Sequence, residues 1–110
     1  MAVARPQTVK VSNHDYLIAW GEIQTDTNEF LYGRTVPRLT VIQINDQVAK
    51  SQQRDTLLHE LLHAAINETH LKFGEDAEEE VIRVMTPLLL QIIRENPKVV
   101  RWLREGAPSG

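Results

Sequence analysis

The first half of the chain alternates hydrophobic and polar residues in the manner of β-strands. Residues 8–12 alternate with a period of two, which is typical of a half-buried strand. Residues 39–45 form the clearest strand, since they are rich in β-branched side chains and follow the interruption at Pro37. Residues 14–20 are apolar and fit a strand or a short helix equally well. The pattern therefore predicts a small N-terminal sheet of about three strands.

The second half of the chain shows the longer apolar spacing of helices. A first helix, capped by Ser51 or Asp55, is expected to end between residues 69 and 74. The acidic residues 75–80 suit the first turn of a second helix, because carboxylates stabilise helix N-termini. Pro87 lies inside that second helix, where a kink or a break is expected.

Each helix is expected to bury an apolar face. In the second helix that face comprises Val81, Ile82, Val84, Met85, Leu88, Leu89, Ile92 and Ile93. A short terminal helix is expected over residues 98–105, with Val99, Trp102 and Leu103 docked on the body of the domain. Because the strands come first and the helices follow, the predicted class is α+β.

The composition is that of one globular domain over residues 1–110, with tails 1–6 and 106–110 expected to be disordered. The chain has no cysteine, which excludes disulfides and thiolate metal ligands. Its net charge of −3 gives no reason to expect binding to nucleic acid or to an anionic membrane. There is neither an N-terminal leader pattern nor a long apolar run, so a cytoplasmic protein is expected. The oligomeric state is left open.

The first helix carries the motif His59-Glu60-x-x-His63. The two histidines are four residues apart, so their imidazoles lie on one helix face and can bind the same ion. Glu60 is rotated by about 100° from His59 and can reach a metal-bound water without being a ligand. The expected core stripe of this helix leaves the histidines at its rim and consists of Leu57, Leu58, Leu61, Leu62, Ala65 and Ile66. The motif predicts a zinc site.

A catalytic zinc needs a third protein ligand. His70 lies one position beyond the third histidine of the His-Glu-x-x-His-x-x-Gly-x-x-His proteases, and Ile66 stands where those proteases have glycine. Glu78 is predicted near the middle of the core face of the second helix, whereas Glu79 and Glu80 lie on opposite rims. Since the histidines also lie on a rim, Glu79 or Glu80 is the expected ligand.

Further stretches around the motif are distinctive. They are Tyr32-Gly33, the strand 41–44, the run 54–64, and downstream Glu79, Ile82, Met85, Leu89 and 94–97. Together these residues resemble small phage and prophage proteins of the ImmA/IrrE-like metallopeptidase group, over about residues 30–97. The resemblance implies a zincin-like domain whose third zinc ligand is a glutamate on the following helix. Phage-type spacing favours Glu79, and the pattern of larger members favours Glu80.

These observations predict a phage- or prophage-encoded zinc metallopeptidase. Glu60 is expected to take a proton from a zinc-bound water that attacks a peptide carbonyl. The resemblance implies a narrow protein substrate such as a regulator. A donor for the oxyanion is also required, and the sequence does not choose among Tyr16, Tyr32, His14 and His70.

Two other hypotheses are weighed against the enzyme. A non-catalytic, zinc-stabilised protein-interaction module on the same fold is the main alternative, because a chain this short leaves little room for substrate subsites. Nucleic-acid binding is not expected, since a solvated helix face explains the cationic residues near the C-terminus and their tryptophan, namely Arg94, Lys98, Arg101, Trp102 and Arg104.

Overall fold

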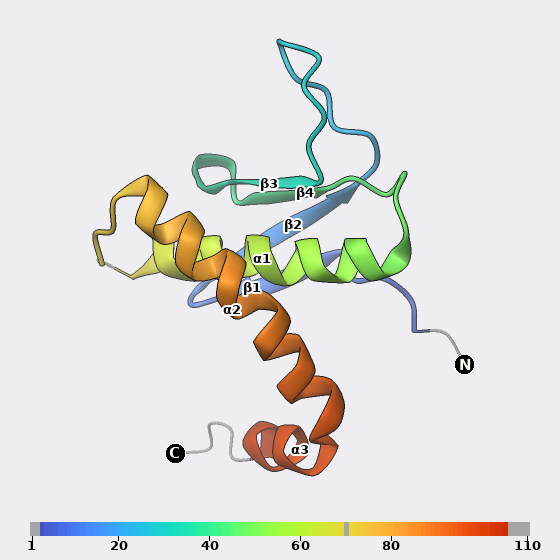
Figure 1. Ribbon diagram of the computed structural model, residues 1–110, viewed down its shortest axis with the longest axis vertical. Coiled ribbons are helices and arrows are strands. Elements are labelled where there is room, and N and C mark those ends of the chain that lie inside the picture. Colours follow the sequence, from blue (N-terminus) through green and yellow to red (C-terminus); the bar gives the residue numbers. More distant parts are fainter. Residues whose placement is uncertain (1–2, 70, 106–110) are drawn as a thin grey trace.

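The computed structural model describes residues 3–69 and 71–105, in which a four-stranded sheet is followed by three α-helices (Figure 1). The predicted α+β class is thus confirmed. The elements in chain order are β1 (Thr8–Val11), β2 (His14–Trp20), β3 (Gly33–Val36), the 3-10 turn η1 (Pro37–Leu39), β4 (Val41–Ile44), α1 (Lys50–Glu68), α2 (Glu75–Glu95) and α3 (Pro97–Glu105).

The sheet has the strand order β1-β2-β4-β3 and mixes both directions of pairing. β1 and β2 form an antiparallel hairpin, β2 runs parallel to β4, and β3 returns antiparallel to β4. Residues 14–20, which fitted a strand or a helix, form the central strand β2. β3 was not predicted, because it begins at a glycine that directly follows the apolar residues 30–32 and includes only one large apolar side chain, Val36. The sheet therefore has four strands rather than the three expected.

Helix α1 covers one face of the sheet (Figure 1). The core between α1 and the sheet consists of side chains from β2, β4 and α1 that are almost fully buried: Tyr16, Ile18, Ile42, Ile44 and Ala64. Leu57 and Leu61 pack against this cluster from the helix. Alternation along β2 and β4 thus sends one set of side chains into the core and leaves the other set toward solvent.

The line of α1 that is most deeply buried consists of Thr56, Glu60 and Ala64, not of the predicted leucines. The leucines of α1 are only partly buried. A close approach to β3 explains the difference, since a Cβ on Gly33 would lie 2.5 Å from Thr56 Cγ2 and 2.9 Å from the Gln43 carbonyl oxygen. Only small or slender side chains fit along that contact.

The N-terminus of α1 also departs from the sequence prediction. Ala49 occupies the N-cap position, and no side chain caps the helix there. Ser51 and Asp55, the expected caps, lie inside the first two turns. The predicted end of the helix was correct, because α1 stops at Glu68 and Thr69 is its C-cap.

Helix α2 continues through Pro87, so the predicted break does not occur. The hydroxyl of Thr86 donates to the Ile82 carbonyl at 2.7 Å within the same stretch. The predicted core face of α2 is wrong, because only Ile82 and Thr86 are buried along the helix. Its C-terminal half extends beyond α1 (Figure 1), and Leu88, Ile92 and Ile93 in that half are 47–49% exposed.

Helix α3 does not dock as predicted. Trp102 is 73% exposed, Leu103 is 64% exposed and Val99 is 49% exposed. Figure 1 shows α3 at the far end of α2, apart from the sheet. Within the described part of the chain, no helix combines the length and the apolar character needed to cross a membrane.

The N-terminal segment before β1 makes specific contacts. Arg5 pairs with Asp46 at 3.1 Å and lies over the ring of Trp20, whose indole N–H donates to the Pro6 carbonyl at 2.8 Å. Residues 106–110 of the expected C-terminal tail lie outside the described residues.

Candidate metal centre

A carboxylate on α2 meets both motif histidines of α1. Oε1 of Glu79 lies 2.9 Å from His59 Nε2, and Oε2 of Glu79 lies 2.9 Å from His63 Nε2. The two imidazole rings are 5.0 Å apart between centroids, as the four-residue spacing on one helix face requires. One donor atom from each of the three residues lies within 4.8 Å of the others.

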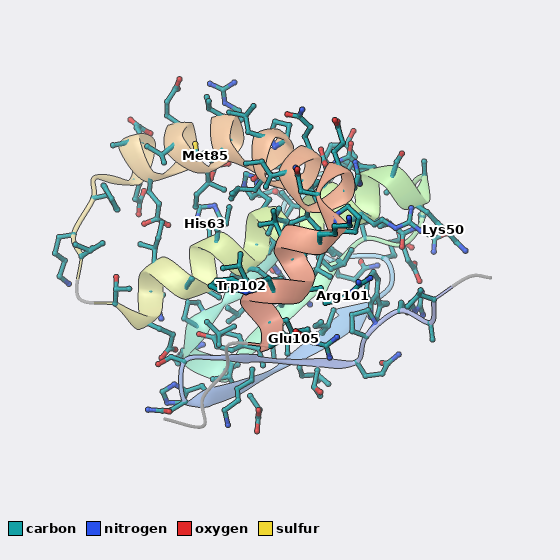
Figure 2. The ribbon with its side chains drawn as sticks, turned by 90° about the horizontal axis from the view of Figure 1, so that it is seen from below. Lys50, His63, Met85, Arg101, Trp102 and Glu105 are labelled. Carbon is teal, nitrogen blue, oxygen red and sulfur yellow. The ribbon has the colours of Figure 1, made fainter. Side chains whose placement is uncertain are left out.

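The crossing of two helices creates this meeting point. α2 packs against α1 through its N-terminal half, with Ile82 buried one turn after Glu79. Figure 2 shows His63 between the two helices. Both histidines project from α1, so the distance between Glu79 and the two imidazoles depends on how α2 packs on α1.

Glu80, the alternative third ligand, points elsewhere. Its carboxylate pairs with Arg83 at 3.0 Å, one turn along α2, and both side chains are largely exposed. The other alternative, His70, lies outside the described residues. Of the two glutamates that the sequence left open, the geometry therefore brings only Glu79 to the histidines.

Glu78 has a different contact with the same site. Its Oε2 lies 2.6 Å from His63 Nδ1. When Nδ1 carries the proton and donates it to this carboxylate, Nε2 keeps a lone pair that points toward Glu79 and can bind a metal. Helical phase predicted Glu78 near the core side of α2, and nothing in the sequence assigned it a role. Its inward position is what lets it orient a ligand.

The charges around His63 favour the protonated form of its imidazole when no metal is bound. Burial lowers the pKa of His63, but the hydrogen bond to Glu78 and the negative charges of Glu60 and Glu79 outweigh burial. The net effect raises the pKa of His63 above its ordinary value of 6.5. A divalent cation among the same carboxylates would replace that proton.

The motif glutamate is buried and held by a residue of β3. Glu60 is only 7% exposed. The Thr35 hydroxyl lies 2.7 Å from Glu60 Oε1 and 3.1 Å from the Glu60 main-chain oxygen. A hydroxyl donates one proton, so it can serve only one of these acceptors at a time. Since Thr35 occupies Oε1, the second carboxylate oxygen, Oε2, is the one available to water.

These side chains line a cleft of about 440 Å³ between β3, α1 and α2. Its walls are Tyr32, Gly33, Gln52, Asp55, Thr56, His59, Glu60, His63, Glu79, Arg83, Thr86 and Pro87. Of the three proposed oxyanion donors that the structure describes, Tyr32 alone lines this cleft, and His70 lies outside the described residues. Tyr16 is fully buried against Glu68, and His14 contacts the same carboxylate at 2.7 Å. The guanidinium of Arg83 also lines the cleft and can donate, although nothing in the sequence had pointed to it for that role.

The donor set suits zinc, which prefers imidazole nitrogen and carboxylate oxygen in a four-coordinate site. Ligands about 2.1 Å from a tetrahedral ion are about 3.4 Å apart, roughly half an ångström more than the present pairs. The side chain of Glu79 is 52% exposed, so a small rotamer change of Glu79 toward solvent would open these distances. The residues present therefore fit a zinc ion, with two histidines and one carboxylate as its protein ligands.

The chain matches no protein-family model, no curated protein and no solved structure. The resemblance to the ImmA/IrrE-like group thus stays a prediction.

Besides Arg83, three residues of the site had no role assigned to them from the sequence, namely Thr35, Gly33 and Glu78. Thr35 and Gly33 belong to a strand that has no clear pattern, so nothing placed them beside α1. Glu78 could have been found from the sequence. It was predicted to face inward, and a buried carboxylate needs a partner, which the neighbouring motif histidines could supply.

Proposed function

We propose that this protein is a zinc-dependent metallopeptidase. The single observation that supports it most is the convergence of Glu79 with His59 and His63 beside the buried carboxylate of Glu60. Two imidazoles and one carboxylate leave a fourth coordination position for water or substrate, which is the arrangement of catalytic rather than structural zinc. A structural site would require a fourth protein ligand.

The protein's own residues supply the remaining steps. A bound zinc provides Lewis acidity toward water and a peptide carbonyl. Glu60 accepts the proton of the attacking water on the carboxylate oxygen that Thr35 leaves available, and then delivers it to the leaving amine. Glu78 holds the proton on Nδ1 of His63. Tyr32 and Arg83 are two groups of the cleft that can donate to the developing oxyanion.

The substrate is proposed to be a protein or peptide. The resemblance to phage metallopeptidases suggests a narrow target such as a regulator. A cleft of about 440 Å³ is sufficient for a few side chains around one peptide bond.

The test compares the zinc-loaded protein with the Glu60→Gln variant. Both are incubated with a mixture of defined peptides and with whole lysates, and new N-termini are identified by mass spectrometry. Zinc-dependent cleavage that Glu60→Gln abolishes while it keeps about one zinc per chain supports the proposal. Equal cleavage by both proteins, or zinc binding that survives the loss of both histidines, contradicts it.

A second candidate is a zinc-stabilised interaction module without peptidase activity. It is favoured by the large apolar side chains exposed on α2 and α3, which include Leu88, Ile92 and Trp102. In that case zinc removal should lower the stability of the fold, and Glu60→Gln should change neither stability nor any binding activity.

A further inference from the structure

The outward side of α2 carries four apolar residues that we name the outer stripe: Val81, Met85, Leu88 and Ile92. Each is between 40% and 49% exposed. Their spacing of four, three and four residues is the spacing of a coiled-coil seam. At 100° per residue they fall within about 60° of one another, so they form one continuous row along the helix.

The outer stripe is separate from the face that α2 uses against α1. Ile82 and Thr86, the buried residues of α2, lie about 90–130° around the helix from the middle of the stripe. Glu79 lies about 150° from it. A second molecule that covered the stripe would therefore leave the candidate metal centre open.

Charge is distributed unevenly along α2 and α3, which we together name the arm (residues 75–105). Residues 75–80 at the start of α2 contain five carboxylates and no cation. Residues 94–105, which end α2 and form α3, contain four cations, Arg94, Lys98, Arg101 and Arg104, against two carboxylates. Figure 2 shows Arg101 and Trp102 on different sides of α3. One end of the arm is thus anionic and the other cationic, with the apolar row between them.

We propose that the outer stripe binds a second copy of this chain, with the two α2 helices antiparallel. In that orientation Val81 of one copy faces Ile92 of the other, and Met85 faces Leu88. The anionic start of each α2 then lies beside the cationic end of its partner. The surface is complementary to itself, which is the condition for a two-fold symmetric dimer. A parallel arrangement would place like charges together at both ends.

The charge pattern disfavours a membrane as the occupant. A helix that lies on an anionic bilayer has cations along the whole of its polar face. α2 instead begins with Glu75, Asp76, Glu78, Glu79 and Glu80. Only the last third of the arm would be attracted to such a surface, whereas an antiparallel copy is matched at both ends.

Cross-linking tests the orientation, because the chain has no cysteine of its own. Val81→Cys and Ile92→Cys are prepared as separate proteins, one with a tag that changes its mass, and are oxidised alone and as a mixture. The antiparallel dimer predicts that the mixed disulfide forms at least about tenfold faster than either self-disulfide. Self-disulfides of Val81→Cys as the main product would overturn the antiparallel arrangement.

Sedimentation of the full chain tests the dimer itself. Leu88→Asp should raise the dimer dissociation constant at least about 100-fold, since it buries a charge at the centre of the stripe. Leu39→Asp is the matched control, because Leu39 is 60% exposed on η1 and lies outside the stripe. Circular dichroism checks that both variants fold. High salt should weaken the wild-type dimer.

Three results would reject the proposal. The first is a wild-type chain that remains monomeric at about 100 μM. The second is a dimer that Leu88→Asp leaves intact. The third is a monomer that co-sediments with phosphatidylserine vesicles and is released by Leu88→Asp, which would make a membrane the occupant. The proposal does not depend on the peptidase hypothesis, since neither the stripe nor its test involves zinc.

Discussion

Oε2 of Glu78 lies 2.6 Å from Nδ1 of His63, on the side of the imidazole opposite to Glu79. Two consecutive glutamates of α2 thus hold the two nitrogens of one histidine. Glu78 fixes the orientation of the His63 ring and the proton on its Nδ1. Glu79 contacts Nε2, the nitrogen that is proposed to bind zinc. This division of roles gives the first prediction.

Glu78→Gln should lower zinc affinity by about 10–100-fold, the usual effect of removing a carboxylate that orients a metal-binding histidine. The amide keeps the size of the side chain but loses the charge that holds the Nδ1 proton. Competition with a fluorescent chelator measures the affinity. Asp76→Asn is the matched control, because Asp76 is an exposed carboxylate in the same first turn. If the two variants bind zinc equally well, Glu78 has no part in the site.

Zinc affinity should also depend on pH through His63. Because its folded pKa is raised above 6.5, the protonated ring stabilises the metal-free fold below pH 6.5, and this stabilisation is lost as pH rises through the raised value. Zinc requires the neutral ring, so affinity should rise with pH by up to about tenfold per unit until that value is passed. Glu78→Gln removes the largest contribution that raises the pKa of His63. The midpoint of the affinity profile should therefore move to lower pH, and an unshifted midpoint would contradict the assignment.

The third ligand can be tested with neighbouring glutamates. Glu79→Ala should reduce zinc affinity by at least about 100-fold, because two histidines alone bind zinc weakly. Glu80→Ala should change it by less than about twofold, since Glu80 pairs with the exposed Arg83 and with no other described residue. Isothermal titration of both variants and of wild-type protein decides the matter. A larger loss in Glu80→Ala would transfer the ligand role to Glu80 and leave the zinc hypothesis in place.

The α+β class, with strands before helices, could be predicted from the sequence, because the spacing of residues 8–12 and the helical spacing of the second half were both clear. Helical phase restricted the third ligand to Glu79 or Glu80, since a rim of α2 was expected to face a rim of α1, and only the resemblance favoured Glu79. What failed was the choice of buried faces. Eight apolar residues on α2 suggested a wide core face, yet a chain of this size offers α1 and one sheet to cover it, and only Ile82 became fully buried among them.

The contact of β3 with α1 could not be predicted for a different reason. It depends on the absence of a side chain at Gly33, and a glycine after an apolar run indicates a turn as readily as a close approach. Thr35 gained its importance from the same contact. The role of Thr35 depends on where β3 lies in the fold. The residues around Thr35 form no pattern that reveals this position, so a single sequence gives no signal for it.

Gly33 therefore carries the last prediction. Gly33→Ala places a methyl group 2.5 Å from Thr56 Cγ2 and 2.9 Å from the Gln43 carbonyl oxygen, so β3 and α1 must separate. We expect a loss of about 1–3 kcal/mol in the free energy of unfolding, as for other overpacked contacts. Denaturant titration measures it. Gly74→Ala is the control, since a Cβ there has no atom within 4 Å.

A double mutant separates the two contacts. Thr56→Ser removes Cγ2 but leaves the hydroxyl, so Gly33→Ala should cost less in the Thr56→Ser background than in wild-type protein. The rescue should be partial, because the carbonyl of Gln43 belongs to the backbone of β4 and cannot move away without disturbing its pairing with β3. An equal cost of Gly33→Ala in both backgrounds would show that Thr56 does not set the distance between β3 and α1. Loss of zinc binding in parallel with stability would link this packing to the candidate metal centre.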